Sequence, residues 1–217
     1  MRLRRASNWT ILEYLSRDIL SGRHLTWKKC VQVTETDIPD VKIIEPVRHG
    51  DHRGFFSEIY NRERFREAGI TLDFVQENYS YSQAVNTLRG LHFQTGPFAQ
   101  DKVVQVVSGA IMDFVVDLRS GSPWFGQYVK AEISASNWRQ ILVPKGFAHG
   151  LVTLEPDTAV MYRVTAHYSA DHDTGIRWND PDIGIDWPVS EADVVLSEKD
   201  QQLPFLSECA TLFTYTA

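Results

Sequence analysis

Two adjacent β-branched segments restrict the fold of this chain more than any other feature. They span residues 103–107 (VVQVV) and 111–118 (IMDFVVDL), and the Ser108-Gly109 step between them predicts a β-hairpin. Further strand-like segments follow at short spacing, with turn residues between them, at 128–134, 140–143, 151–154 and 159–165. Many short strands at even intervals are typical of a sandwich or barrel, so we expect a mainly all-β domain.

Helix signals are few along the chain. Residues 62–68 (RERFREA) end at Gly69 and predict one short helix. A shorter helical turn is expected near residues 197–200, and the N-terminal segment could form a third helix. We therefore expect a few short helices around a β barrel.

The first 32 residues differ in charge from the rest. They carry seven Lys and Arg against Glu13 and Asp18, a net charge of +5, whereas residues 33–217 carry −11. We expect residues 1–32 to be an extension outside the core and residues 33–217 to form a single domain. An amphipathic helix at a membrane surface, or a transit peptide, remains an alternative for the extension.

Composition excludes several classes of partner and site. The net charge of −6 argues against nucleic acid, whose phosphates require a basic face. No run of about 18 apolar residues is present, so no transmembrane span is expected. Cys30 and Cys209 lie far apart in the sequence, which indicates neither a disulfide framework nor a thiolate zinc site. We expect a cytoplasmic protein that binds neither membrane nor nucleic acid.

Four ionisable side chains fall in two motifs that a compact β fold could direct into one cavity. The motif LRGLHFQ (88–94) contains Arg89 and His92, and Lys102 follows ten residues after the histidine. The motif PKGFAHG (144–150) ends near His149. These residues are the first candidates for a functional site.

The second motif, late in a β barrel, favours a cupin, a double-stranded β-helix or jelly-roll barrel. Cupins usually bind a metal through a His-x-His pair, a carboxylate and a later histidine. Here the pair is His92-Phe93-Gln94, and an amide binds transition metals poorly. The Lys102 ammonium would also repel a divalent cation. We expect no metal and no cofactor, with a metal cupin as an alternative.

An imidazole, an ammonium and a guanidinium without a metal suit proton abstraction beside a carbonyl. A base removes a carbon-bound proton, a cation stabilises the enolate oxygen, and an acid returns a proton, which can reach the other face. Epimerisation is the natural outcome of such a sequence. The residues therefore favour an isomerase over a binding module.

At this level of detail the chain resembles dTDP-4-dehydrorhamnose 3,5-epimerase, over residues from about 43 to 206. The resemblance rests on landmarks in order at 51–56 (DHRGFF) with Glu58, 76–78 (QEN), 88–94, 100–104 (QDKVV), 117–126 (DLRSGSPWFG), 144–150, 178–181 (WNDP) and 196–200 (LSEKD). It implies a homodimeric, metal-free cupin barrel that acts on a dTDP-linked 4-keto-6-deoxy sugar.

The resemblance also implies roles for single residues. His92 corresponds to the base that takes the protons at C3 and C5, and Asp200 to its orienting partner. Lys102 corresponds to the enolate stabiliser at the C4 oxygen, and Tyr162 to the phenol that reprotonates the opposite face. The implied substrate-binding residues are Arg53, Glu58, Gln76, Asn78, Arg89, Asp113 and His149. Arg53 and Glu58 are expected to reach in from the partner subunit.

Two positions depart from the family pattern. His49 stands where these epimerases commonly carry an aromatic residue four positions before the arginine of DHRGFF, which leaves the identity of the nucleotide open. Residues 83–87 (QAVNT) are one residue longer than the usual approach to LRGLH. Because His92 and Tyr162 are both present, we expect epimerisation at both carbons. Epimerisation at only one carbon, or sugar-nucleotide binding without catalysis, are the alternatives.

Overall fold

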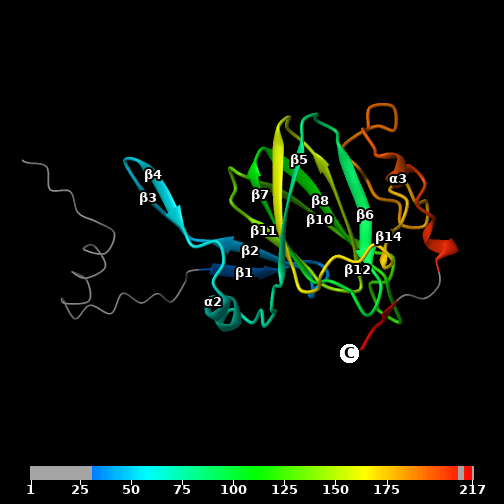
Figure 1. The fold of residues 1–217 in the computed structure, drawn as a ribbon, viewed down its shortest axis with the longest axis horizontal. Helices are drawn as coiled ribbons and strands as arrows, with labels where there is room; N and C mark the ends of the chain where they lie inside the picture. Colours follow the sequence, from blue (N-terminus) through cyan, green and yellow to red (C-terminus); the bar gives the residue numbers. More distant parts are fainter. Residues whose placement is uncertain (1–30, 210–212, 217) are drawn as a thin grey trace, which may run out of the picture. The chain divides into compact units, whose positions relative to one another are not determined.

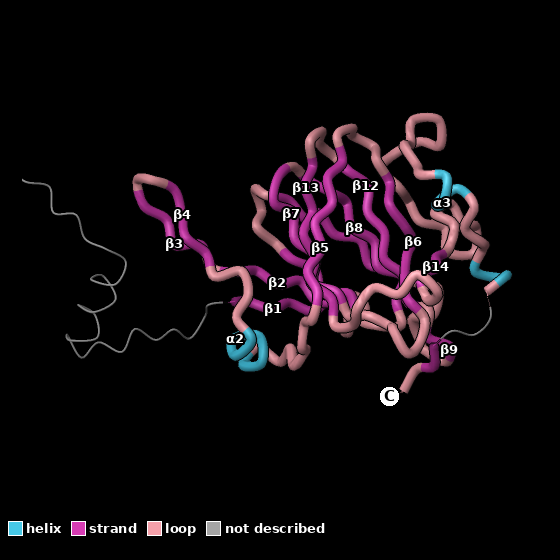
Figure 2. Tube along the Cα trace, in the orientation of Figure 1, coloured by secondary structure: helices cyan, strands magenta, loops and turns pink. Residues whose placement is uncertain are grey.

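The computed structural model describes residues 31–209 and 213–216. Two β-sheets face each other (Figure 1), and most of the ordered backbone is strand, with helices only at the periphery (Figure 2). The strand order of the larger sheet is β1-β2-β11-β7-β13-β5, and that of the smaller sheet is β10-β8-β12-β6-β14. All pairs within both sheets are antiparallel. This is the expected all-β jelly-roll architecture.

The element bounds are as follows. The larger sheet contains β1 (Val31–Glu35), β2 (Lys42–Pro46), β5 (Gln76–Ser82), β7 (Lys102–Ser108), β11 (Gln140–Val143) and β13 (Thr158–Val164). The smaller sheet contains β6 (Leu88–Gln94), β8 (Ala110–Asp117), β10 (Tyr128–Ser134), β12 (Phe147–Thr153) and β14 (Asp173–Gly175). Two short pairs are β3 (Arg48–Asp51) with β4 (Gly54–Ser57), and β9 (Arg119–Ser120) with β15 (Phe213–Thr214). The helices are α2 (Arg62–Glu67), α3 (Glu198–Gln201) and the 3₁₀ turn η1 (Leu206–Glu208).

The hairpin expected at Ser108-Gly109 is wrong. Strand β7 lies in the larger sheet between β11 and β13, whereas β8 lies in the smaller sheet between β10 and β12. Gly109, at φ +77°, is the corner where the chain passes from one sheet to the other. The physical reason is that both segments are nearly continuous apolar runs. Such strands need neighbours on both edges and packing on both faces, which a two-stranded hairpin cannot supply.

The other expected elements are largely confirmed. Helix α2 begins where Asn61 caps it, since the Asn61 side chain accepts hydrogen bonds from the backbone N–H groups of Glu63 and Arg64. The short helical turn near residues 197–200 is α3. Strand β12 begins at Phe147, four residues before the expected segment, because PKGFAHG runs directly into the sheet and buries Phe147 and Ala148.

Two of the expectations concern the start of the chain. The expected N-terminal helix, and the extension expected over residues 1–32 except its last two residues, fall on residues 1–30, which lie outside the described residues. The boundary expected near Val33 falls inside β1, which starts at Val31 and pairs with β2. Within the described part of the chain, no helix is long and apolar enough to cross a membrane.

The apolar core has two parts. Between the sheets, β-branched side chains of β7, β8, β11 and β13 pack together, among them Val104, Val115, Ile141 and Val160. The outer face of the smaller sheet is covered by the chain after β14, which buries Leu91, Phe93 and Ile176. Strand β6 therefore has one face against this covering segment and the other toward the larger sheet.

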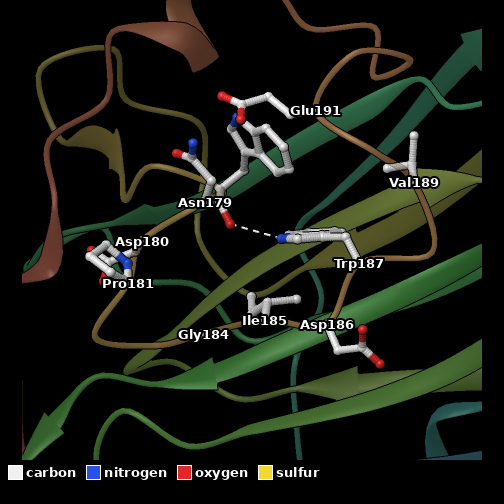
Figure 3. A pocket seen from close by; sticks show the side chains of 10 residues that line it. Asn179, Asp180, Pro181, Gly184, Ile185, Asp186, Trp187, Val189 and Glu191 are labelled. Atoms are coloured by element: carbon white, nitrogen blue, oxygen red, sulfur yellow. Dashed lines mark hydrogen bonds between the residues drawn. The ribbon is translucent and has the colours of Figure 1, made fainter.

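The WNDP motif belongs to that covering segment. The Trp187 Nε1–H donates to the Trp178 carbonyl at 2.8 Å, as Figure 3 shows beside an open pocket. The Asp180 carboxylate accepts from the backbone N–H groups of Asp182, Ile183 and Leu206. These contacts join residues 178–187 to one another and to the start of η1 at Leu206, so the motif serves the fold.

The β3–β4 hairpin stands away from both sheets (Figure 1). Nearly all its residues are exposed, including Phe55 at 49% and Phe56 at 66%. It is anchored at its base, where the Trp138 Nε1–H donates to Ser57 Oγ at 2.9 Å and the Phe55 ring meets the Trp138 ring edge-on. The two phenylalanines give this hairpin an exposed apolar surface.

Close packing of β14 against β6 makes the first prediction. A Cβ at Gly175 would lie 2.2 Å from the Leu91 carbonyl oxygen, so we expect Gly175→Ala to destabilise the protein by about 1–3 kcal/mol. In Gly50→Ala, the nearest heavy atom to the new Cβ is 3.7 Å away, and stability should hardly change. Urea unfolding of both variants tests this. Equal stability of the two would show that β14 can shift away from β6 at little cost.

Candidate active site

Strand β6 aligns the site. His92 faces His149 on β12 and Gly175 on β14, and Gln94 faces Asp173. Because side chains alternate along a strand, His92 and Gln94 point to the face opposite the buried Leu91 and Phe93, toward the larger sheet. The register therefore brings side chains from three strands to one side of the smaller sheet.

His92 forms a dyad with Asp200. The His92 Nε2 lies 2.6 Å from Asp200 Oδ1, and the Asp200 side chain is only 5% exposed. Burial alone would raise the pKa of Asp200, but the hydrogen bond and charge of His92, together with Ser197 and the Gly90 backbone, lower it. Asp200 thus stays a carboxylate that can orient the imidazole and stabilise its protonated form.

His149 forms a second dyad, with Asp113. The His149 Nε2 lies 2.8 Å from Asp113 Oδ2, and Asp113 is fully buried. Burial raises the pKa of Asp113, while His149 and Lys102 act to lower it. The other oxygen, Oδ1, has no hydrogen-bond partner within the described chain. A buried acceptor of this kind is available to a ligand donor.

Lys102 lies within the reach of two carboxylates. Burial lowers the pKa of its ammonium to about 8, although the negative charges of Asp173 and Asp113 act to raise it. The lysine opens β7, opposite Val164 of β13 and Val143 of β11. An ammonium that titrates near neutral pH can stabilise an oxyanion and respond to the charge of a bound substrate.

Tyr162 and Arg89 occupy the same region. Tyr162 lies on β13 between Val104 of β7 and Asn78 of β5. Burial raises the pKa of its phenol, Arg89 acts to lower it, and Asp173 raises it further. The Arg89 side chain donates to Ser82 Oγ at 3.2 Å and to the Tyr81 carbonyl at 3.0 Å, which fixes the guanidinium over β5.

The remaining binding candidates divide into two groups. Gln76 and Asn78 alternate with exposed residues along β5, and Gln76 Nε2 donates to Asn78 Oδ1 at 2.8 Å. Arg53 lies at the β3–β4 hairpin, where it pairs with Asp51, and Glu58 accepts from Asn61. The structure therefore does not bring Arg53 and Glu58 to the His92 cluster of their own chain.

Two charged residues at the site carried no role in the sequence argument. Lys199 Nζ lies 2.5 Å from Asp173 Oδ2, and the Tyr168 hydroxyl donates to the same oxygen at 3.4 Å. The sequence could have indicated Lys199 as a site residue, since it stands in LSEKD beside Asp200. No motif indicates Asp173, because only the pairing of β14 with β6 places it two residues from the Gly175–His92 pair.

Gln94 explains the incomplete metal motif. Its buried amide donates to the carbonyls of Phe98 at 2.8 Å and His167 at 3.1 Å, and accepts from the Ser169 N–H at 2.7 Å. All its polar atoms are thus engaged by backbone. Among residues 31–209 and 213–216, no three His, Cys, Asp or Glu side chains gather in a way that could hold a metal ion.

The arrangement is suited to acid–base chemistry at carbon. It combines a histidine oriented by a buried carboxylate, a lysine ammonium near neutral pKa and a phenol on the facing sheet. Such groups can remove a proton beside a carbonyl, stabilise the resulting enolate and return a proton. This chemistry needs no redox partner.

A jelly-roll barrel with this site defines a cupin-type isomerase. The model of the dTDP-4-dehydrorhamnose 3,5-epimerase family matches residues 35–208, and the chain belongs to that family. The Sinorhizobium fredii dTDP-4-dehydrorhamnose 3,5-epimerase is 49% identical over 82% of this chain and 91% of that relative.

Solved structures agree with the family assignment. The Bacillus anthracis dTDP-4-dehydrorhamnose 3,5-epimerase, with TDP and PPi bound, is 52% identical, covers 81% of this chain and 99% of that one, and gives a TM-score of 0.78. The Legionella pneumophila dTDP-6-deoxy-D-glucose-3,5-epimerase, in complex with dTDP-4-keto-L-rhamnose, is 42% identical. It covers 86% of this chain and 100% of that one, and gives a TM-score of 0.82. The expected cupin-like fold is thereby confirmed.

The lowered pKa of Lys102 makes the second prediction. If the ammonium stabilises the developing oxyanion, kcat/KM should fall as the pH rises through about 8, where the free enzyme loses that proton. In Lys102→Arg the guanidinium stays protonated, so the alkaline limb should move to higher pH even though the maximal rate falls. Lys130→Arg, at an exposed lysine, is the control. If the alkaline limb of the kcat/KM profile were unchanged in Lys102→Arg, that limb would reflect the titration of another group.

Proposed function

We propose that this protein epimerises dTDP-4-dehydro-6-deoxy-D-glucose at C3 and C5 to give dTDP-4-dehydro-L-rhamnose. The observation that carries the proposal is the 2.6 Å contact between His92 and the buried Asp200, in a barrel that also holds Lys102 and Tyr162. A histidine held in this way is a base with a defined tautomer. The relatives named above are epimerases of this class.

The dyad geometry defines the proton path. Because Asp200 occupies the Nε2 side of the imidazole, the neutral ring carries its proton on Nε2 and keeps its lone pair on Nδ1. Nδ1 takes the carbon-bound proton, and the electrons of the C–H bond move to the C4 carbonyl oxygen. The resulting enolate is stabilised by the Lys102 ammonium.

Reprotonation completes each epimerisation. The Tyr162 phenol comes from the larger sheet, whereas His92 comes from the smaller one, so the two groups approach a bound sugar from different sides. Tyr162 gives its proton to the carbon, the C4 carbonyl re-forms, and the configuration inverts. His92 then releases its proton to solvent and the Tyr162 phenolate takes one up, which resets both groups for the second carbon. The burial that raises the pKa of the phenol keeps it protonated and able to act as the acid.

The remaining candidates hold the nucleotide and the sugar. Arg89 supplies a planar guanidinium for the diphosphate, and Gln76, Asn78 and His149 supply hydrogen-bonding groups nearby. Asp113 Oδ1, buried without a partner in the described chain, accepts from a substrate hydroxyl. Lys199, whose Nζ lies 2.5 Å from Asp173 Oδ2, adds positive charge beside these residues.

We infer a cytoplasmic homodimer in which Arg53 and Glu58 complete the partner's site. The support is the β3–β4 hairpin, whose exposed Phe55 and Phe56 are unusual on a free surface and whose Arg53 lies away from its own His92 cluster. The free thiol of Cys209 fits a reducing compartment.

Solvent exchange tests the reaction. Proton NMR of dTDP-4-dehydro-6-deoxy-D-glucose with the enzyme in deuterated water should show loss of signal at both C3 and C5 and formation of the L-lyxo product. His92→Asn should lower this exchange by about 10²–10⁴-fold while dTDP still binds, because only the base is removed. Exchange at one carbon would make the enzyme a single-site epimerase. No exchange, with dTDP bound, would leave a sugar-nucleotide-binding protein.

Mixing of two inactive variants tests the shared site. In a heterodimer of Arg53→Ala and His92→Asn subunits, one barrel keeps its own His92 and receives an intact Arg53 from the partner. Random reassortment should therefore restore about a quarter of the wild-type sites. If Arg53 served its own barrel, no site would be intact and the mixture would stay inactive. A monomer by sedimentation would also contradict the dimer.

A further inference from the structure

Four consecutive residues beside the site are held by glutamine side chains. Gln94 Nε2 donates to the His167 carbonyl and Gln94 Oε1 accepts from the Ser169 N–H. Gln76 Oε1 accepts from the Tyr168 N–H at 3.0 Å, and Gln100 Nε2 donates to the Ala166 carbonyl at 2.8 Å. Residues 166–169 therefore have one backbone group each fixed by a side-chain amide.

We call these four contacts to residues 166–169 the glutamine clamp, and Gln94 makes two of them. It is only 4% exposed, and besides residues 167 and 169 it holds the Phe98 carbonyl at 2.8 Å. It therefore links strand β6 to two separate loops. A buried amide whose donors and acceptor are all paired is rigid, because breaking any one bond leaves a desolvated polar group.

The clamped segment presents Tyr168 at the rim of the site. Tyr168 is 59% exposed, and its hydroxyl donates to Asp173, which in turn pairs with Lys199 next to Asp200. Gln94 grips the backbone on both sides of this residue, at 167 and at 169. The backbone around Tyr168 is thus held in place while most of the residue stays exposed to solvent.

We propose that Gln94 is a positioning residue for substrate binding, which acts by fixing Tyr168 and its loop. The proposal rests on the proposed function, because a fixed rim matters only if a nucleotide sugar binds there. A loop that is ordered before binding does not lose its conformational entropy when the ligand arrives, so the clamp lowers KM. At the position where a metal-binding cupin carries a histidine, this chain carries Gln94, which supports the loop at residues 166–169.

Gln94→Glu tests the clamp with little change in size. The acceptor for Ser169 is kept, but both donors are lost and a carboxylate oxygen faces the carbonyls of Phe98 and His167. KM should rise by about tenfold, the effect of losing roughly one net hydrogen bond, while kcat stays within about twofold. Hydrogen exchange of the Tyr168 and Ser169 amides should accelerate. Gln94→Asn, which keeps the amide but shortens its reach, replaces this variant if Gln94→Glu does not fold.

Gln140→Glu is the matched control. Gln140 is also fully buried and donates twice through Nε2, to the Ile59 carbonyl and to Gln105 Oε1, but on the larger sheet. It should lose stability without the rise in KM or the faster exchange at residues 168 and 169. Unchanged KM and exchange in the Gln94 variants would overturn the proposal. An inactive wild-type enzyme would refute the proposed function instead, while amide exchange would still test the clamp.

Discussion

The position of β6 between β12 and β14 is the constraint on which the site depends. That pairing sets His92 opposite His149 and Gly175, and Gln94 opposite Asp173, so one strand brings both dyads and the rim of the site together. The close approach requires a glycine at position 175, where a Cβ would meet the Leu91 carbonyl. On its other face, Leu91 and Phe93 are buried under the chain after β14, which fixes the register, since a shift by one residue would expose both.

Charges inside the barrel are compensated in pairs. Asp200 faces His92, Asp113 faces His149 and Asp173 faces Lys199, so each carboxylate has a basic partner within hydrogen-bonding distance. Lys102 has no such partner among the described residues and is held only by the longer-range charges of Asp173 and Asp113. Burial lowers the pKa of this ammonium to about 8, because the two carboxylates only partly offset the loss of solvation. Without a bonded partner in the described part of the chain, the ammonium is available to a developing oxyanion.

Elements whose signals lie in neighbouring residues were predicted correctly, whereas the assignment of strands to sheets was not. Helix α2 was predictable because residues 62–68 and the terminal Gly69 are adjacent in the sequence, and the strands β10 and β11 were predictable from their patterns. The hairpin at Ser108-Gly109 was wrong because a two-sided apolar run does not say which sheet it joins. Motifs identified His92, Lys102, His149 and Asp200, and the structure shows two His–Asp contacts, His92 with Asp200 and His149 with Asp113, near the Lys102 ammonium. It places Arg53 and Glu58 elsewhere, on the exposed hairpin and just after it.

The sequence by itself determined the all-β class, the family and the residue types available for acid–base chemistry, because short motifs and strand spacing are enough to indicate them. Only the tertiary structure decided which strands are neighbours, and hence that Asp173 joins the site and that Gln94 supports the loop carrying Tyr168. The reason is that strand pairing joins residues far apart in the chain, and sheet order depends on the packing of all strands at once rather than on any local pattern.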